Sequence, residues 1–371
     1  MISSLLPPTP VVAQSMIYVS QESIYALHVH DGSLSHTYPV QGSIMVTVAN
    51  DLLYASVNRH PDYQILAFHR TTGRQMWRYA LHTQLPAAPA IANNRAYISV
   101  DEGMIHALDA TTGKLVWRSQ IPLDPTLPPF LRPLSVASPV ISEGTVFLAP
   151  VVNEPSQAFV YAFQESDGKA LWQARLPEPP SHALTAFDHV LYLGTSSRCL
   201  ALRPGDGSII WQAQVDGRPS SPPVLSAGLI YLACSEFNDK SSLYALQAQD
   251  GSLLWKYDLL AGSPTIPAAL AGTVCIGSGD GSLHALRATD GTLRWKAQTQ
   301  GRFLSTPAMA DDRVYVGASD GYLYAFHLES GRPAWTTFIP GTLQVRAQTT
   351  MLQHELHFEI IPPGGLGEQG C

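Results

Sequence analysis

The stretch Ala107-Leu108-Asp109-Ala110-Thr111-Thr112-Gly113-Lys114-Leu115-Val116-Trp117 decides the fold of this chain, because its pattern recurs along the sequence. An alanine is followed six residues later by a glycine and ten residues later by a tryptophan. The chain has seven tryptophans, and the pattern uses all of them: Trp77, Trp117, Trp172, Trp211, Trp255, Trp295 and Trp335. An eighth copy begins at Ala26 and has His36 at the tryptophan position. The sequence is therefore an array of eight repeats.

The spacing of the repeats and the residues between them favour β-structure. The glycines of the pattern are separated by 41, 40, 55, 39, 44, 40 and 40 residues. A period of about forty fits propeller blades, and it also fits helical repeats of the HEAT type. The chain between the copies consists of short runs rich in valine, isoleucine and tyrosine, such as 145–148 and 313–316, which predict strands. We therefore predict an all-β fold, an eight-bladed β-propeller of four-stranded antiparallel blades.

One repeat shows how a blade is expected to form. Segments 306–310, 314–318, 322–327 and 333–338 predict four strands, separated by turns that contain aspartate, serine or glycine. Glycine accepts the positive φ of a tight hairpin turn. The alanine of the pattern falls on the third strand and the tryptophan on the fourth, so the indole fills space that the alanine leaves. We assign the seven tryptophans a structural role in packing one blade against the next.

The alanine–glycine–tryptophan pattern resembles the tryptophan-docking motif of the pyrroloquinoline-quinone (PQQ) repeat family, from about Pro10 to Gly341. The resemblance implies an eight-bladed propeller whose tryptophans wedge between neighbouring blades. The family includes quinoprotein alcohol dehydrogenases, the propeller lipoprotein of the outer-membrane barrel-assembly machinery, and many propellers without known activity. The motif is structural, so it does not choose among these branches.

The sequence lacks the signature motifs of both the dehydrogenase branch and the lipoprotein branch. The dehydrogenases stack their quinone on a disulfide between adjacent cysteines, whereas no two of the four cysteines here are neighbours. They also hold calcium, and Glu102, Asn153 and Asp280 have no spacing that singles them out as ligands. The lipoprotein branch carries a signal that ends in a cysteine, and residues 1–20 contain no lysine, arginine or cysteine. We therefore expect no metal and no cofactor, with PQQ and calcium only if the chain is an oxidoreductase.

Composition restricts the partners. The formal net charge is -7 and basic residues do not cluster, which argues against nucleic-acid binding. No apolar run of about eighteen residues predicts a transmembrane helix. The three internal cysteines fall on or beside predicted strands, where we expect buried thiols: Cys199, Cys234 and Cys275. We predict a monomer.

The repeats claim nearly the whole chain, so we predict one propeller domain over residues 10–360 and a disordered tail over residues 361–371. A ninth pair of predicted strands at 346–360 either closes the ring against the first blade or belongs to another blade. The compartment stays open, because the chain shows no signal peptide while the family resemblance favours an extracytoplasmic location.

The candidate binding surface is one face of the propeller. In a meander the loops between second and third strands share a face with the loops between blades, and the long insertions all fall there: 56–64, 121–133, 150–157 and 235–241. Variable loops on one face of a regular scaffold often carry binding sites. The candidate residues on this face are Arg59, His60, Asp62, Tyr63, Phe130, Arg132, Asn153, Glu154, Glu236, Phe237, Asn238, Asp239 and Lys240.

This mixture of aromatic and charged residues suits a protein or peptide partner; the alternative is that the loops are merely solvated. We find no catalytic motif, neither a nucleophile elbow nor a phosphate-binding glycine loop. The sequence therefore favours a non-catalytic scaffold or recognition module that binds a protein or small ligand. The alternative is a PQQ-dependent or degenerate quinoprotein oxidoreductase.

Overall fold

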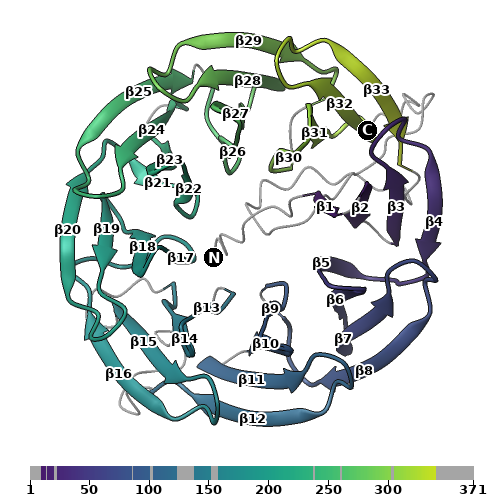
Figure 1. The fold of residues 1–371 in the computed structure, drawn as a ribbon, viewed down its shortest axis with the longest axis vertical. Coiled ribbons are helices and arrows are strands. Elements are labelled where there is room, and N and C mark those ends of the chain that lie inside the picture. Colours follow the sequence, from purple (N-terminus) through teal and green to yellow (C-terminus); the bar gives the residue numbers. More distant parts are fainter. Residues whose placement is uncertain are drawn as a thin grey trace, which may run out of the picture.

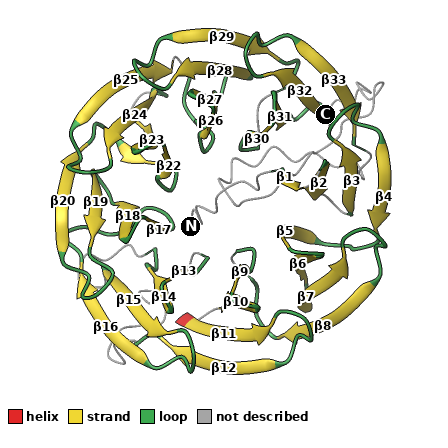
Figure 2. Ribbon diagram, viewed as in Figure 1, coloured by secondary structure: helices red, strands yellow, loops and turns green. Residues whose placement is uncertain are grey.

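The structure is a computed structural model, and it describes residues 10–13, 15–20, 23–85, 87–100, 103–122, 138–151, 158–236, 239–259, 261–301 and 305–339. The described strands form eight separate antiparallel sheets arranged as a closed ring (Figure 1). Figure 2 shows the strands joined by turns and loops all around the ring. The predicted all-β, eight-bladed propeller is confirmed. The predicted strand pair at 346–360 and the tail at 361–371 lie outside the described residues.

The first four blades are consecutive along the chain. Blade one contains β1 (Val11–Ala13), β2 (Met16–Ser20), β3 (Ile24–His28) and β4 (Leu34–Tyr38). Blade two contains β5 (Ser43–Ala49), β6 (Leu52–Arg59), β7 (Asp62–His69) and β8 (Gln75–Leu81). Blade three contains β9 (Ala90–Ala92), β10 (Arg95–Val100), β11 (Met104–Asp109) and β12 (Leu115–Gln120). Blade four contains β13 (Val140–Ser142), β14 (Thr145–Leu148), β15 (Phe159–Gln164) and β16 (Ala170–Arg175).

The last four blades complete the ring. Blade five contains β17 (Thr185–Phe187), β18 (Val190–Gly194), β19 (Arg198–Leu202) and β20 (Ile209–Gln214). Blade six contains β22 (Val224–Ser226), β23 (Leu229–Ser235), β24 (Ser241–Gln247) and β25 (Leu253–Leu259), and the short β21 (Arg218–Pro219) also pairs with β23. Blade seven contains β26 (Ala268–Leu270), β27 (Thr273–Gly277), β28 (Ser282–Arg287) and β29 (Leu293–Gln298). Blade eight contains β30 (Ala308–Ala310), β31 (Arg313–Gly317), β32 (Tyr322–His327) and β33 (Pro333–Phe338).

The alanine and tryptophan of each repeat are cross-strand partners, as the sequence predicts. Ala107 on β11 faces Trp117 on β12, and the same pairing recurs in every blade that has a tryptophan. Directly after the alanine the register shifts in all eight blades, as at Ala107/Leu108. A shift of this kind inserts one residue and bends the strand. The bulge was not visible in the sequence.

Each tryptophan joins its own blade to the next one. The indole N–H of Trp77 donates a hydrogen bond of 2.9 Å to the carbonyl oxygen of Ala110, three residues before Gly113 of blade three. The other six tryptophans donate to the equivalent carbonyls, at 2.8–3.1 Å. The indole also lies against the glycine, because a Cβ built on Gly113 would be 2.5 Å from Trp77 Cε3. The glycine is thus needed for close approach as well as for its φ of 68°.

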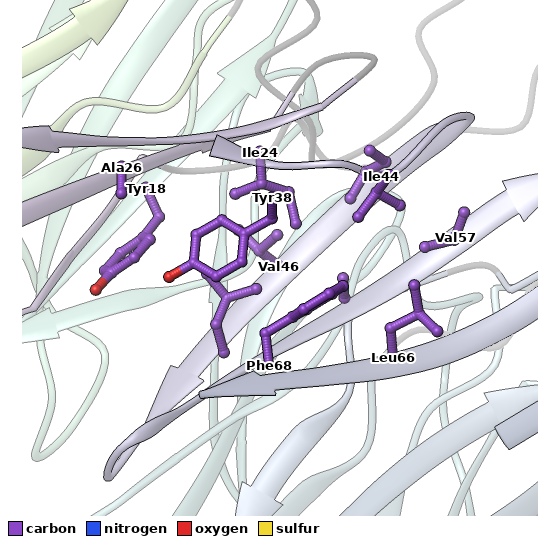
Figure 3. Close-up of a cluster of buried hydrophobic side chains, with 12 residues drawn as sticks. Tyr18, Ile24, Ala26, Tyr38, Ile44, Val46, Val57, Leu66 and Phe68 are labelled. Atoms are coloured by element: carbon purple, nitrogen blue, oxygen red, sulfur yellow. The ribbon is translucent and has the colours of Figure 1, made fainter. Parts of the chain in front are cut away.

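Blade one uses a different residue for the same purpose. His36 Nε2 lies 3.1 Å from the carbonyl oxygen of Arg70, and the hydroxyl of Tyr38 donates to that oxygen at 2.5 Å. The seam between blades one and two is filled by a cluster that includes Tyr38, Ile44 and Phe68 (Figure 3). Seven further clusters fill the other seams, so the hydrophobic core is divided among eight interfaces.

The ring closes where blade eight packs on blade one. Trp335 Nε1 donates to the carbonyl oxygen of Val29 at 3.0 Å, and Thr337 Oγ1 donates to that of Gly32 at 2.8 Å. Arg313 Nη1 donates to Val29 and His30 oxygens at 2.8 and 2.5 Å. Each of these blades is built from consecutive strands of the chain, and the described contacts that close the ring are made by side chains, including the indole.

Candidate functional site

The meander places the connections of each blade on two faces. We call the face that holds the loops between second and third strands and the links between blades the loop face; the other is the turn face. On the loop face, blade two carries the residues Arg59, His60, Asp62 and Tyr63 that the sequence singles out. They lie at the tip of the hairpin formed by β6 and β7, whose eight residues each make them the longest of the described strands.

The insertion predicted as a long loop at 56–64 is mostly strand, and that part of the prediction is wrong. Asn58 pairs with Tyr63 and Arg59 with Asp62, which leaves only two residues for the turn. The reason is a buried anchor beneath the tip. The side chain of Asn58 donates to the carbonyl oxygen of Leu85 and accepts from its N–H, both at 2.8 Å. We call this hairpin, residues 52–69, the blade-two arm.

Blade six carries a second lengthened hairpin, residues 229–247, which we call the blade-six arm. Its strands β23 and β24 have seven residues each. Glu236 and Lys240 close its tip, because the N–H of Glu236 donates to the carbonyl oxygen of Lys240 at 2.8 Å. Asp239 lies in this tip in the left-handed region, with φ 56°. Six other predicted binding residues lie outside the described part of the chain: Phe130, Arg132, Asn153, Glu154, Phe237 and Asn238.

The two arms lie on opposite sides of the ring, four blades apart (Figure 1). The described candidate residues therefore form two separate groups rather than one site. One group is at the blade-two arm. The other, at the blade-six arm, lies next to a groove.

This groove lies on the loop face between blades five and six and has a volume of about 630 Å³. The loop after β18, the link from β20 to β21, and the base of the blade-six arm form its walls. Its lining residues are Ser196, Ser197, Gln214, Val215, Asp216, Gly217, Arg218, Ser235 and Glu236. Glu236 is the one described residue of the predicted set that lines it.

A single lysine holds the acidic wall of the groove. Lys256 Nζ lies 3.3 Å from Asp216 Oδ2, 3.1 Å from Glu236 Oε1 and 3.5 Å from Asp258 Oδ1. It also lies 5.4 Å from the centre of the Tyr244 ring. Partial burial acts against the charged lysine, but hydrogen bonds to Glu236, Tyr244 and Asp216 outweigh it and raise the pKa of Lys256. The hydrogen bond from Lys256, with one from Tyr244, lowers the pKa of Asp216.

The opposite wall is held by Glu178. This carboxylate accepts hydrogen bonds from Thr195 Oγ1 at 2.8 Å and from the N–H of Ser197 at 2.9 Å. Arg198 Nε lies 3.3 Å away. Burial alone would favour the neutral acid, but these donors and the arginine lower the pKa of Glu178. Both walls of the groove therefore contain residues held by hydrogen bonds to charged side chains.

A buried polar chain in blade seven has the residue types of a hydrolase triad. Ser282 Oγ lies 2.8 Å from His284 Nε2 and bonds to Asp280, while the hydroxyl of Tyr257 lies 2.9 Å from His284 Nδ1. Ser282 is wholly buried, so a substrate cannot reach its oxygen. Burial lowers the pKa of His284 to about 4. This group of hydrogen-bonded side chains joins Tyr257 of blade six to blade seven.

The described cysteines do not form the pair on which quinoprotein dehydrogenases stack their cofactor. Cys199, Cys234 and Cys275 are buried free thiols in three successive blades, as predicted. Burial raises the pKa of Cys199 to about 12, so it stays a neutral thiol. Among the described residues, no three histidines, cysteines or carboxylates are grouped to hold a metal ion. The described residues include no helix long and apolar enough to span a membrane.

Comparison with known families agrees with the repeat architecture. A family model described as "Outer membrane protein assembly factor BamB" matches residues 61–233 and 239–355. The chain is 24% identical over 223 residues to outer membrane protein assembly factor BamB of Yersinia pestis, covering 53% of this chain and 52% of that protein. It is 28% identical over 160 residues to the dehydrogenase subunit of a quinone alcohol dehydrogenase from Gluconacetobacter polyoxogenes, covering 39% and 21%.

Solved structures show the same fold. BamB from Moraxella catarrhalis superposes with a TM-score of 0.68 at 17% identity, covering 86% of this chain and 95% of that one. The chain spans only 21% to 52% of the length of the curated relatives it matches. The relatives include both assembly factors and oxidoreductases.

Sequence reasoning missed the residues that hold the groove, chiefly Asp216, Tyr244 and Lys256. Lys256 directly follows the motif residue Trp255, but basic residues occupy the same position in three other blades: Arg78, Arg118 and Lys296. Asp216 lies in a link of ordinary length. The signal that unites them is spatial, because they come from two neighbouring blades.

Proposed function

Since the chain belongs to the PQQ-repeat family described as outer membrane protein assembly factor BamB, we propose that it is a non-catalytic propeller scaffold that binds a protein partner through its loop face. The observation that carries the proposal is the concentration of lengthened hairpins and of the groove on one face, while the turn face is built from short turns. A rigid ring with one variable face is suited to recognition.

The two arms support a binding surface on the loop face. Arg59 and His60 are exposed at the tip of the blade-two arm, and Lys240 is exposed at the blade-six arm. Arms on opposite sides of a ring can hold a partner at two points, which restricts its orientation more than one contact does. The names of the relatives support an extracytoplasmic location, with an assembly factor of the outer membrane as the model.

The test is capture of a partner from the native extract by the tagged protein after mild crosslinking. The informative variant combines Arg59→Glu with Lys240→Glu. Its matched control combines Lys114→Glu with Arg203→Glu, which makes the same charge change at exposed positions of the turn face. We expect the loop-face variant to lose a partner that the wild-type and control proteins retain, with unchanged melting temperatures. Equal capture by all three proteins would contradict the proposal.

A second candidate is a quinoprotein oxidoreductase, which the match to the quinone alcohol dehydrogenase favours. It requires that the chain bind PQQ together with calcium. Titration of the protein with both, followed by absorbance and by reduction of an artificial acceptor with an alcohol, separates the two functions. The scaffold proposal predicts neither binding nor turnover.

A further inference from the structure

Within the part of the chain that the structure describes, the outer strand of every blade pairs with only one neighbour, which leaves its other edge unpaired. Exposed strand edges invite pairing with another chain, and proteins commonly guard them with charged residues or proline. Five of the eight outer strands follow this rule with a lysine, an arginine or an aspartate: β8, β12, β16, β25 and β29. The other three are β4, β20 and β33.

The edge of β20 is the least guarded of these three. Its sequence Ile-Ile-Trp-Gln-Ala-Gln has no charge and no proline, and Ile209 and Ile210 are each 40% exposed. β33 begins with Pro333, and β4 has one exposed aliphatic residue, Leu34. Ile210 directly precedes the motif tryptophan of blade five, and the same position in blade seven is Arg294. An arginine at this position therefore fits the outer strand of a blade and places a charge on its edge.

The edge of β20 leads directly into the groove. Gln214 is both the last residue of β20 and a lining residue, and Val215 and Asp216 continue the same wall. A segment added beside β20 would therefore run into the groove at one end. No other outer strand of the described blades ends in this groove.

The end of such a segment would meet Asp216. The side chain of Asp216 is 77% exposed and uses Oδ2 for its contacts with Tyr244 and Lys256. Its Oδ1 has no partner among the described residues. Arg218 also lines the groove but belongs to β21, which pairs with Ser235 in the sheet of blade six. At this end of the edge Asp216 thus presents a carboxylate oxygen that is without a partner among the described residues, while Arg198 donates to the side chains of Gln212 and Gln214.

From these observations we propose that an extended segment of a partner protein adds as a further strand to β20, with aliphatic side chains over Ile209 and Ile210 and a lysine or arginine beside Asp216. Such strand addition obtains its affinity from main-chain hydrogen bonds and its specificity from the side chains. The inference rests on the proposed scaffold function and names the kind of segment that the scaffold would hold.

The experiment uses the full chain and synthetic peptides of eight residues that alternate valine and threonine. One peptide ends in lysine and its counterpart ends in glutamate, and each is made with the charge at either terminus. Hydrogen exchange locates the binding, and fluorescence anisotropy measures it. We expect protection of the β20 amides by a lysine peptide, with affinity about tenfold above that of the glutamate peptide. Asp216→Asn should abolish this preference.

Ile210→Arg places on β20 the charge that Arg294 places on the outer strand of blade seven. It should abolish the protection of the β20 amides by the peptide. Leu254→Arg is the matched control, because Leu254 occupies the same position in blade six and is also 40% exposed. Both variants are compared only after their melting temperatures are shown to match. Lack of protection at β20 with every peptide, equal protection of β25, or a preference for glutamate would overturn the inference. If partner capture persists while β20 stays unprotected, the scaffold function stands and the edge proposal fails.

Discussion

Trp335 donates its indole N–H to the carbonyl oxygen of Val29 over 3.0 Å, although the two residues are 306 positions apart in the sequence. This bond joins the last blade to the first. It repeats the contact that the other six tryptophans make between consecutive blades, so the chain closes the ring with the same device that extends it.

Trp335→Ala should lower the free energy of unfolding by about 3–5 kcal/mol, the usual cost of removing a large aromatic side chain from a packed site. The loss should appear first as faster hydrogen exchange in blades one and eight, because those blades share the seam. Urea denaturation and exchange measured by mass spectrometry test this. Phe187→Ala is the control, since Phe187 is 50% exposed and contributes little to a seam. Uniform loss of protection around the ring would contradict a local role for this seam.

Two glycines have nearly the same φ, but only one of them lies against a docking tryptophan. Comparing alanine substitutions at the two positions separates the cost of losing the docking contact from the cost of the backbone conformation. Gly251 has φ 73° and Gly228 has φ 78°. A Cβ on Gly251 would lie 2.5 Å from Trp211 Cε3, whereas a Cβ on Gly228 would meet nothing within 4 Å.

Both alanine substitutions should cost about 1–2 kcal/mol for the left-handed conformation. Gly251→Ala should cost about 1–3 kcal/mol more, because the indole must move. The difference between the two variants in urea denaturation measures the contact. Equal destabilisation would mean that the glycine serves only the turn.

Two buried histidines should make the protein less stable in mild acid. Burial lowers the pKa of His284 to about 4, and burial with the nearby Arg218 lowers that of His182 to about 3. In the unfolded chain a histidine has a pKa of about 6.5. The unfolded chain therefore binds more protons between these values, and stability falls as the pH drops below about 6.5. The contribution is fully present above that pH.

The test is the free energy of unfolding from chemical denaturation at several pH values between 7.5 and 5. Its slope with pH gives the number of protons bound on unfolding, which should approach one for each of the two buried histidines. His284→Gln, which cannot titrate, should flatten the pH dependence. A dependence unchanged in the double variant with His182→Gln would exclude these side chains as its source.

Lys256→Met should destabilise the protein by about 1 kcal/mol at neutral pH, since it leaves three carboxylates without their shared cation. The figure is modest because the side chain is 28% exposed. The deficit should shrink as the pH falls, since protonation removes the repulsion among the carboxylates. Lys114→Met on the turn face is the control and should be nearly neutral. A deficit that stays constant down to acid pH would point to lost packing instead.

The blade count and the pairing of Ala107 with Trp117 were predictable because they depend on local patterns that repeat every blade. The β-bulge after each alanine was not, because nothing in the pattern distinguishes a shifted register from a regular one. The groove was not predictable for a different reason. Asp216 lies in the link from blade five to blade six, and Lys256 lies forty residues later on the outer strand of blade six, so the two meet only in the folded ring. The sequence periodicity describes each blade but not the side chains that meet between blades.

Because every blade is encoded by one continuous segment and seven of the eight seams are joined by the same indole contact, the position of the chain ends is not essential to the ring. A circular permutant that links the ends of the described propeller and opens the chain between two other blades keeps all eight blades intact. New ends placed in the link between blades seven and eight would leave the groove and both arms on an unbroken chain. The loop face can thus be fused to another protein from a chosen point on the circumference.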